Sequence, residues 1–477
     1  MTAELAEPNA SLRWSVYVLL MFVALGAMLG RIAAVDSVDK IALDANRLKT
    51  KEPLKKGATA GLPSSAARTP LETTAGQASS GTPTPLCRPF LSANDRSRWC
   101  TVRALVESDM RVAGTPYAID RVIEQPNWDT IDMVKHDGHL YSSKPPLLPT
   151  LMAAVYWPIH RLTGATLGTH PYAIGRFFLI LFNIVPLAIY FVLLAALVER
   201  FGTTDWGRIF VVAAAVFGAF LTTFAVTINN HLPAAVCAVA AVYAAVRIWF
   251  DGERRLRYFV IAGLFGALAT TNEFPALALL AAIALVLAWK APRPTLIAFA
   301  PAVLVVAAAF FGTNWIAHRT LEPAYLHRGG ADDWYDYTYQ VRGRTIESYW
   351  KNPKGVDRGE ASRGVYATHS LVGHHGIFSL TPIWLLSVVG LGVWMFRRGD
   401  ARLRWSAAAV AAISLACIGF YLAQPLMNRN YGGVTSGPRW VFWLAPLWLL
   451  AMTPAADLMA RRRWARRCVT GPGPRRC

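Results

Sequence analysis

The sequence predicts an all-α polytopic membrane protein with about ten transmembrane helices and external cap loops. Two properties of the composition point to this class: 54% of the 477 residues are hydrophobic, and the mean hydropathy is +0.33. The third observation is that the apolar residues are gathered in blocks long enough to cross a hydrocarbon core of about 30 Å. A single soluble domain is therefore excluded.

Ten apolar blocks have the length of a membrane span. They cover residues 14–34, 172–198, 208–228, 232–250, 258–274, 276–290, 296–312, 377–396, 405–424 and 439–458. A shorter block, 147–163, is interrupted by Pro149, Pro158 and Arg161. We expect this block to lie along the outer leaflet or to dip into it. If it crossed the membrane instead, the N-terminus would lie outside.

The charge pattern predicts the orientation of the chain. A net charge of +19 would suggest nucleic acid as the partner of a soluble protein. Here Lys and Arg are concentrated in short loops and in the tail 461–467, as the positive-inside rule describes. We therefore expect no nucleic-acid partner, a location in the cytoplasmic (inner) membrane and both termini in the cytoplasm. The loops 35–146, 313–376 and 425–438 then lie outside.

The segments between the blocks divide the chain. The residues 36–92 are rich in Ala, Ser, Thr, Pro, Gly and Lys, a composition that predicts a disordered linker. The predicted parts are a transmembrane anchor at 1–35, the linker at 36–92, a first external loop with an interfacial helix at 93–163, a transmembrane bundle at 164–312, a second external cap loop at 313–376, C-terminal transmembrane helices at 377–460 and a basic cytoplasmic tail at 461–477.

Two features of the N-terminal part leave alternatives. The first apolar block runs past the usual length of a signal-peptide core, so an uncleaved anchor is favoured over a cleaved signal peptide. Cys87 and Cys100 share the first external loop, where they form either a disulfide or two free thiols.

Asp95 is the first candidate for chemistry. Ser92 or Asn94 can cap a helix, and apolar residues recur at helical spacing over 99–106. This pattern predicts a short amphipathic helix on the membrane surface with Asp95 in its first turn. The helix dipole and the neighbouring arginines then favour an ionised carboxylate, which could accept a proton or hold a metal ion. The alternative is a helix N-terminal acid without a catalytic role.

Lys144 is the second candidate. A residue that precedes proline favours extended backbone, and Pro145-Pro146 stiffen the chain that follows. Lys144 thus projects from a rigid corner at the start of an apolar segment, about where a lipid phosphate would lie. A point cation suits such a partner. The alternative is an interfacial lysine that reaches to water.

Together these two sites resemble a known family. The run Asp95-Arg96-Ser97-Arg98-Trp99, a helix through Glu107, and the run Gly138-His139-Leu140-Tyr141-Ser142-Ser143-Lys144-Pro145-Pro146-Leu147 resemble the first external loop of the GT-C glycosyltransferases that use polyprenyl-phosphate sugars. The protein O-mannosyltransferases and the lipid A aminoarabinose transferase are the nearest in pattern. The resemblance implies a GT-C-like fold, Asp95 as the catalytic base or acceptor-orienting acid, and Lys144 at the carrier phosphate. Arg96 and Ser143 stand where that family commonly has acids, which leaves a divalent metal open and no other cofactor expected.

Further polar residues fall on the same predicted face. Arg429 and Arg439 flank a Gly-rich turn with Tyr431, and we expect these three and Arg98 to bind the phosphate or substrate. The alternative is an ordinary turn in which Arg439 anchors the last span. Four weaker candidates for the site, of which Glu273 has a claim to be a second acid, are His231, Glu273, His374 and His375.

These observations predict a membrane glycosyltransferase. It would transfer a sugar from a polyprenyl-phosphate donor to an acceptor on the outer face of the membrane, with inversion at the anomeric carbon as the resemblance implies. One alternative is a transporter or flippase of lipid-linked sugars, which would need polar residues at the bilayer midplane, whereas Ala, Val, Leu and Phe dominate these spans. A non-catalytic scaffold is the other alternative.

Overall fold

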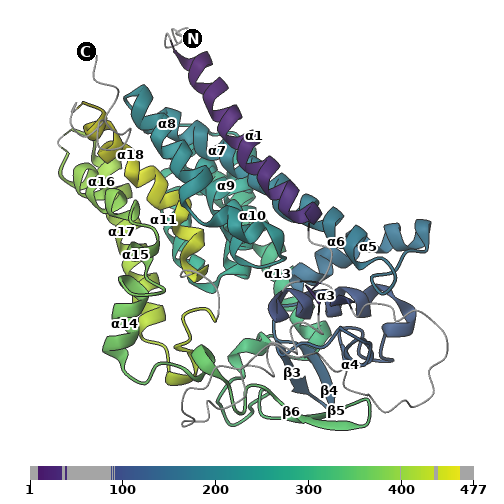
Figure 1. Ribbon diagram of the computed structural model, residues 1–477. Helices are drawn as coiled ribbons and strands as arrows, with labels where there is room; N and C mark the ends of the chain where they lie inside the picture. Colours follow the sequence, from purple (N-terminus) through teal and green to yellow (C-terminus); the bar gives the residue numbers. More distant parts are fainter. Residues whose placement is uncertain are drawn as a thin grey trace, which may run out of the picture.

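A bundle of long helices and a cap of shorter elements make up the protein (Figure 1). The computed structural model describes residues 9–34, 38–39, 87–88, 90, 92–397, 399–433 and 439–461. The predicted linker lies almost wholly outside these residues, apart from strand β1 (Val38–Asp39), which pairs antiparallel with β2 (Cys87–Arg88). The predicted cytoplasmic tail lies outside them beyond Arg461.

Apolar helices form the bundle. They are α1 (Ala10–Ala34), α6 (Pro171–Leu179), α7 (Val185–Phe201), α8 (Asp205–Ala213), α9 (His231–Trp249), α10 (Leu256–Asn272), α11 (Leu277–Lys290), α12 (Pro292–Pro294), α13 (Ala300–His318), α16 (Trp384–Phe396), α17 (Ala401–Leu422) and α18 (Ala445–Arg461). Single π-helical turns continue α6 into α7 and α12 into α13, so each of these pairs is one long helical segment.

Seven described helical segments are long and apolar enough to cross a membrane. They are Ala10–Ala34, Pro171–Phe201, Asp205–Val226, His231–Trp249, Pro292–His318, Ala401–Leu422 and Arg439–Arg461. The other three predicted blocks form α10, α11 and α16, which have 17, 14 and 13 residues. The predicted count of about ten spans is therefore not confirmed.

Small residues allow close packing within the bundle. Gly390 on α16 lies so near α18 that a Cβ atom there would come within 1.8 Å of the carbonyl oxygen of Ala451. Close approach of this kind is typical of helices that associate in membranes, where dispersion contacts replace the hydrophobic effect. Helix α9 is buried along most of its length and forms the centre of the bundle.

Polar contacts join the helices at the bundle end that holds the start of α1 and the end of α18 (Figure 1). The Arg13 guanidinium lies 2.7 Å from a carboxylate oxygen of Glu199 and 2.6 Å from one of Asp205. Asp457 on α18 accepts hydrogen bonds from the backbone and hydroxyls of residues 203–204. This end of α1 and of α18 is thus tied to the turn between α7 and α8.

The opposite end carries the cap (Figure 1). Its helices and strands are α3 (Ala93–Val106), α4 (Asp120–Ile123), β3 (Met133–His136), β4 (His139–Ser142), α5 (Leu147–Thr163), β5 (Thr338–Val341), β6 (Arg344–Glu347), α14 (Arg363–Leu371) and α15 (Ile377–Leu380). Strands β3 and β4 pair antiparallel, with Met133 opposite Ser142. Asp137 and Gly138 join them with positive φ angles of 47° and 82°, as a tight hairpin turn requires.

The two halves of the cap hold each other through backbone atoms. The amide of Lys135 donates to the carbonyl of Trp334 at 3.0 Å, and the Tyr337 hydroxyl donates to the carbonyl of Met133 at 3.1 Å. The Trp350 indole N–H donates to the carbonyl of Ile131 at 2.8 Å. The segment 131–135 is therefore held by a loop about 200 residues later in the chain, since Tyr337 lies 204 residues after Met133 and Trp350 lies 219 residues after Ile131.

Helix α3 differs from the prediction of an amphipathic helix at the surface. It begins after Ser92, whose Oγ accepts the Asp95 amide at 3.1 Å. Its side chains are buried on almost every face, because the cap, α5 and α6 enclose it. Trp99 stacks on Phe90 at 4.6 Å between ring centroids and meets the edge of Phe178 at 5.5 Å. The predicted interfacial segment 147–163 forms α5, which packs against α3.

Candidate functional site

Three cations from separate parts of the chain form a cluster beneath the cap, and we call them the basic cluster: Arg98, Lys144 and Arg439. Arg98 comes from α3, Lys144 follows β4, and Arg439 begins the last helical segment, Arg439–Arg461. The charges of Arg98 and Arg439 both act to lower the pKa of Lys144, so the three cations lie within electrostatic range of one another. The structure thus brings together three of the predicted phosphate-binding residues.

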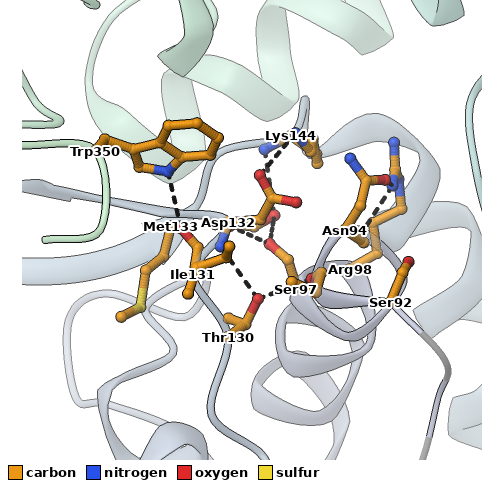
Figure 2. Close-up of polar contacts among 12 residues, drawn as sticks. Ser92, Asn94, Ser97, Arg98, Thr130, Ile131, Asp132, Met133, Lys144 and Trp350 are labelled. Atoms are coloured by element: carbon orange, nitrogen blue, oxygen red, sulfur yellow. Dashed lines mark hydrogen bonds and ion pairs between the residues drawn. The ribbon is translucent and has the colours of Figure 1, made fainter. Parts of the chain in front are cut away.

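Lys144 forms an ion pair with Asp132. Its Nζ lies 3.2 Å from Asp132 Oδ1 (Figure 2). Its backbone amide donates to Ser142 Oγ at 3.2 Å, and Ser142 Oγ lies 2.6 Å from Ser97 Oγ. Ser97 in turn donates to the Asp132 carbonyl. Burial lowers the pKa of Lys144, and the charge of Asp132 opposes this change.

Asp132 was not among the site residues that the sequence predicted. It precedes β3, and the β3–β4 register places it beside Ser143, whose amide donates to the Asp132 carbonyl at 3.1 Å. The signal was present, since Asp137-Gly138 is a strong hairpin turn pair between the short runs 133–136 and 139–142. A hairpin over 133–142 brings Asp132 next to Lys144.

Arg98 links α3 to the bundle. Its Nη2 donates to Asn230 Oδ1 at 2.8 Å, and its Nη1 is hydrogen-bonded to the carbonyl and the side-chain oxygen of Asn94. Burial lowers the pKa of Arg98 to about 10, against the attraction of Asp132 and Asp95. The guanidinium remains charged at neutral pH and is held rigidly at the start of α9.

Glu273 lies in the turn between α10 and α11 and is hydrogen-bonded to three residues. Asn230 Nδ2 donates to Glu273 Oε1 at 2.7 Å, and His231 Nδ1 is hydrogen-bonded to the same oxygen. The Tyr421 hydroxyl donates to Oε2 at 3.5 Å. Burial raises the pKa of Glu273 to about 8, although Arg439 and Arg98 act to lower it. At pH 7 the carboxyl is therefore mostly protonated.

Arg439 completes the basic cluster. It interacts electrostatically with Asp132, Glu273 and Asp357, and within the described part of the chain its buried Nε has no hydrogen-bond partner. Asp95 acts on Arg98 as well, so four carboxyl groups act on the three cations. Burial raises the pKa of Glu273 to about 8 and that of Asp95 to about 7, so at pH 7 the first is mostly neutral and the second is partly neutral. Positive charge exceeds negative charge, so the site is suited to an anion such as a phosphate group.

Asp95 is buried, whereas the sequence predicted an ionised carboxylate at the membrane surface. Its Oδ1 accepts the Trp99 indole N–H at 2.8 Å and the Ile228 amide at 3.2 Å. The residue is 2% exposed, and burial raises its pKa to about 7 in spite of Arg98 and Arg96. The predicted direction is wrong because α3 is enclosed rather than exposed at a surface. These contacts hold α3 against the turn before α9.

Replacing Asp95 by Asn is expected to remove a pH dependence of stability. The folded pKa of about 7 exceeds the usual value of 3.8, so the stability from Asp95 is complete below pH 4 and is lost as the pH rises to 7. Alone, this shift corresponds to a cost on the order of 4 kcal/mol at pH 8. An amide oxygen can accept both hydrogen bonds. The variant should therefore unfold at a higher temperature than wild type at pH 8, with the difference shrinking toward pH 4.

The measurement is thermal unfolding of the purified protein in detergent over pH 4–8. Asp109→Asn is the matched control, because Asp109 is exposed and lies in the same cap. A difference in unfolding temperature between wild type and Asp95→Asn that stays constant over this range would contradict the assignment.

The remaining predicted residues lie around a second cluster. Arg429 donates to the carbonyls of Gln424, Glu360 and Ala361, so it holds the chain there. Tyr431 stacks on His375 at 4.9 Å between ring centroids.

His374 also belongs to this second cluster and stacks on His369 at 5.3 Å. Tyr421 and Tyr431 line the same small pocket, and Tyr421 also reaches Glu273. Tyr421 therefore links this second cluster to Glu273, whose charge acts on Arg98 and Arg439.

The sequence left open whether the protein holds a divalent metal and whether Cys100 forms a disulfide. Among them, no group of three or more His, Cys, Asp or Glu residues is arranged to hold a metal ion. Cys100 is a buried free thiol, whose Sγ lies 3.5 Å from the Trp128 carbonyl oxygen. Of the two predicted alternatives, a disulfide or a free thiol, Cys100 therefore has the free thiol.

No family model and no curated protein matches the chain. Among solved structures, the chain is similar to the crystal structure of the Archaeoglobus fulgidus oligosaccharyltransferase in the apo form, at 12% sequence identity and a TM-score of 0.40. The similarity covers 80% of this chain and 49% of that chain, so the chain spans about half the length of its structural match.

Proposed function

We propose that this chain is a membrane glycosyltransferase that takes a sugar from a polyprenyl-phosphate donor. The basic cluster is the single observation that carries the proposal. Arg98, Lys144 and Arg439 come together next to helices that are apolar enough to lie in a membrane, and Glu273 does not neutralise them at pH 7. A lipid phosphate fits this combination, because its tail stays in the bilayer while its charged group enters the site.

The chemistry follows from that placement. When the bond between the anomeric carbon and the phosphate oxygen breaks, negative charge grows on the phosphate. Cations that are already in position stabilise this charge without reorganising. Attack from the face opposite the phosphate would invert the anomeric carbon. The proposal includes a GT-C-like arrangement, a location in the cytoplasmic membrane and a cap on its outer face.

The transporter alternative is less well supported. The buried ionisable residues of the site lie at the cap end of the bundle, in α3, in the segment after β4 and in the turn before α11. A substrate path across the membrane would need such groups along the spans. Chemistry at one surface is therefore the better explanation of the cluster.

Binding of the carrier tests the proposal without knowledge of the sugar. Undecaprenyl phosphate should raise the unfolding temperature of the purified protein, and undecaprenol, which lacks the phosphate, should not. Lys144→Ala should weaken the binding of undecaprenyl phosphate by about 10-fold or more, since one charge-assisted contact contributes about 1.5–3 kcal/mol.

The control is Lys290→Ala, because Lys290 is an exposed lysine at the end of α11. It should bind as wild type does. Equal stabilisation by undecaprenol and undecaprenyl phosphate, or equal affinity of Lys144→Ala and wild type, would overturn the proposal.

A further inference from the structure

We infer that Asp132, and not Asp95, is the general base that activates the acceptor. The inference rests on the proposed function. It assigns the role of proton acceptor, which the three cations of the basic cluster cannot fill. A nucleophile that loses a proton needs an acceptor for it within hydrogen-bond reach, and a positioned carboxylate is suited to this task.

One oxygen of Asp132 is free to act. Its Oδ1 pairs with Lys144 at 3.2 Å, and its Oδ2 has no hydrogen-bond partner within the described part of the chain. The side chain is 13% exposed, so a ligand can reach it. The carboxylate thus has one oxygen that fixes its position on the basic cluster and one that is available to a substrate hydroxyl.

Asp95 has the opposite properties. Two donors share its Oδ1, and it is 2% exposed beneath Trp99. A substrate hydroxyl would have to displace the contact between α3 and Ile228 to reach it. Asp95 therefore positions the helix that carries Arg98, while Asp132 faces the site itself.

The second half of the cap positions Asp132. Trp350 donates to the carbonyl of Ile131 at 2.8 Å, and Tyr337 donates to the carbonyl of Met133 at 3.1 Å, so the residues on both sides of Asp132 are held. Its own amide donates to Thr130 Oγ1 at 3.2 Å. In the view of Figure 2, the Trp350 indole and the Arg98 guanidinium lie on opposite sides of the Asp132 carboxylate.

Transfer of the sugar to the acceptor needs no group besides these. The oxygen of the acceptor hydroxyl attacks the anomeric carbon, and the hydroxyl proton passes to Asp132 Oδ2. The bond between that carbon and the phosphate oxygen breaks, and its electron pair stays on the phosphate. Polyprenyl phosphate leaves with an added negative charge, which the basic cluster stabilises, and Asp132 later returns the proton to water.

Azide provides a test that does not require the natural acceptor. Azide is already an anion, so it attacks carbon without transferring a proton and needs no base. Membranes that contain each variant are given labelled undecaprenyl-phosphate glucose, mannose and galactose, with and without azide. Transfer to endogenous acceptors and formation of the glycosyl azide are both measured.

We expect Asp132→Ala to lower transfer by about 10²- to 10⁴-fold, the usual contribution of a general base. Azide should restore consumption of the donor in Asp132→Ala and yield the glycosyl azide. It should not restore Lys144→Ala, because Lys144 acts on the donor phosphate and not on the proton of the acceptor. Asp109→Ala, an exposed aspartate of the same cap, should behave as wild type.

The outcomes separate the two proposals. If Asp132→Ala keeps wild-type transfer, or if azide fails to restore it while undecaprenyl phosphate still binds, Asp132 is not the base. If azide restores Asp95→Ala instead, Asp95 is the base. If wild type consumes none of the donors and does not bind undecaprenyl phosphate, the proposed function itself fails.

Trp350→Phe tests the positioning role, because it removes the indole N–H that holds Ile131 and keeps an aromatic ring at this position. It should lower kcat by several-fold with little change in the KM for the donor, and azide should relieve the defect. A change in the donor KM alone, with kcat unchanged, would show that Trp350 has no effect through Asp132.

Discussion

Lys144→Ala is expected to lower the rate of sugar transfer by about 100-fold or more. The ammonium group lies where the leaving phosphate would gain charge, and the loss of one such preorganised contact typically costs a factor of about 10² to 10³. The basic cluster would keep Arg98 and Arg439, but Asp132 would lose its only described ion-pair partner. The site would then hold one cation fewer and an unpaired carboxylate that repels phosphate.

Lys144→Arg is the matched variant, since it keeps the charge and changes the geometry. It should retain more activity than Lys144→Ala but less than wild type, because a planar guanidinium does not reproduce a point cation. The measurement is the initial rate of label transfer from the donor that wild type uses, at equal amounts of folded protein. Equal rates for Lys144→Ala and wild type would exclude Lys144 from the phosphate site.

Glu273 is expected to set an alkaline limit to carrier binding. Its pKa of about 8 means that it is mostly neutral at pH 7 and becomes charged as the pH rises through 8. The new negative charge acts on Arg98 and Arg439 and opposes the phosphate. Binding of undecaprenyl phosphate should therefore weaken above pH 8. Glu273→Gln imitates the protonated carboxyl and should bind equally well from pH 7 to pH 9.

Glu273→Ala has a different expected effect. It leaves Asn230, His231 and Tyr421 without their shared acceptor in a buried site. Unsatisfied buried groups cost about 1–3 kcal/mol each, so the unfolding temperature should fall clearly for Ala and little for Gln. If wild type and Glu273→Gln lose affinity in parallel above pH 8, another group causes the alkaline limit.

Local patterns in the sequence were sufficient to predict several helices of the structure. Asp95 lies in the first turn of a helix capped by Ser92, as its neighbours predicted. Ten of the predicted apolar blocks fall on helices, although seven segments meet the length and hydropathy of a span. Capping residues and apolar runs act over a few neighbouring positions, so they can be read without knowledge of the fold.

The burial of α3 could not be predicted in this way. Its polar residues looked solvent-facing, yet Arg98 and Asp95 find partners 132 and 133 residues away in the turn before α9. The sign of the pKa change at Asp95 depends on that enclosure, because desolvation outweighs the nearby positive charge. A helix read alone carries no information about what packs over it.

The sequence by itself determined that the chain is rich in membrane-length helices and that Lys144 stands at the start of an apolar segment. Only the tertiary structure decided which acid meets it, because the β3–β4 register brings Asp132 to Lys144 while α3 turns Asp95 toward Ile228. It also brought Arg439 to a site that Arg98 and Lys144 share. Charge and desolvation act through space, so the chemistry of the site depends on contacts between distant parts of the chain.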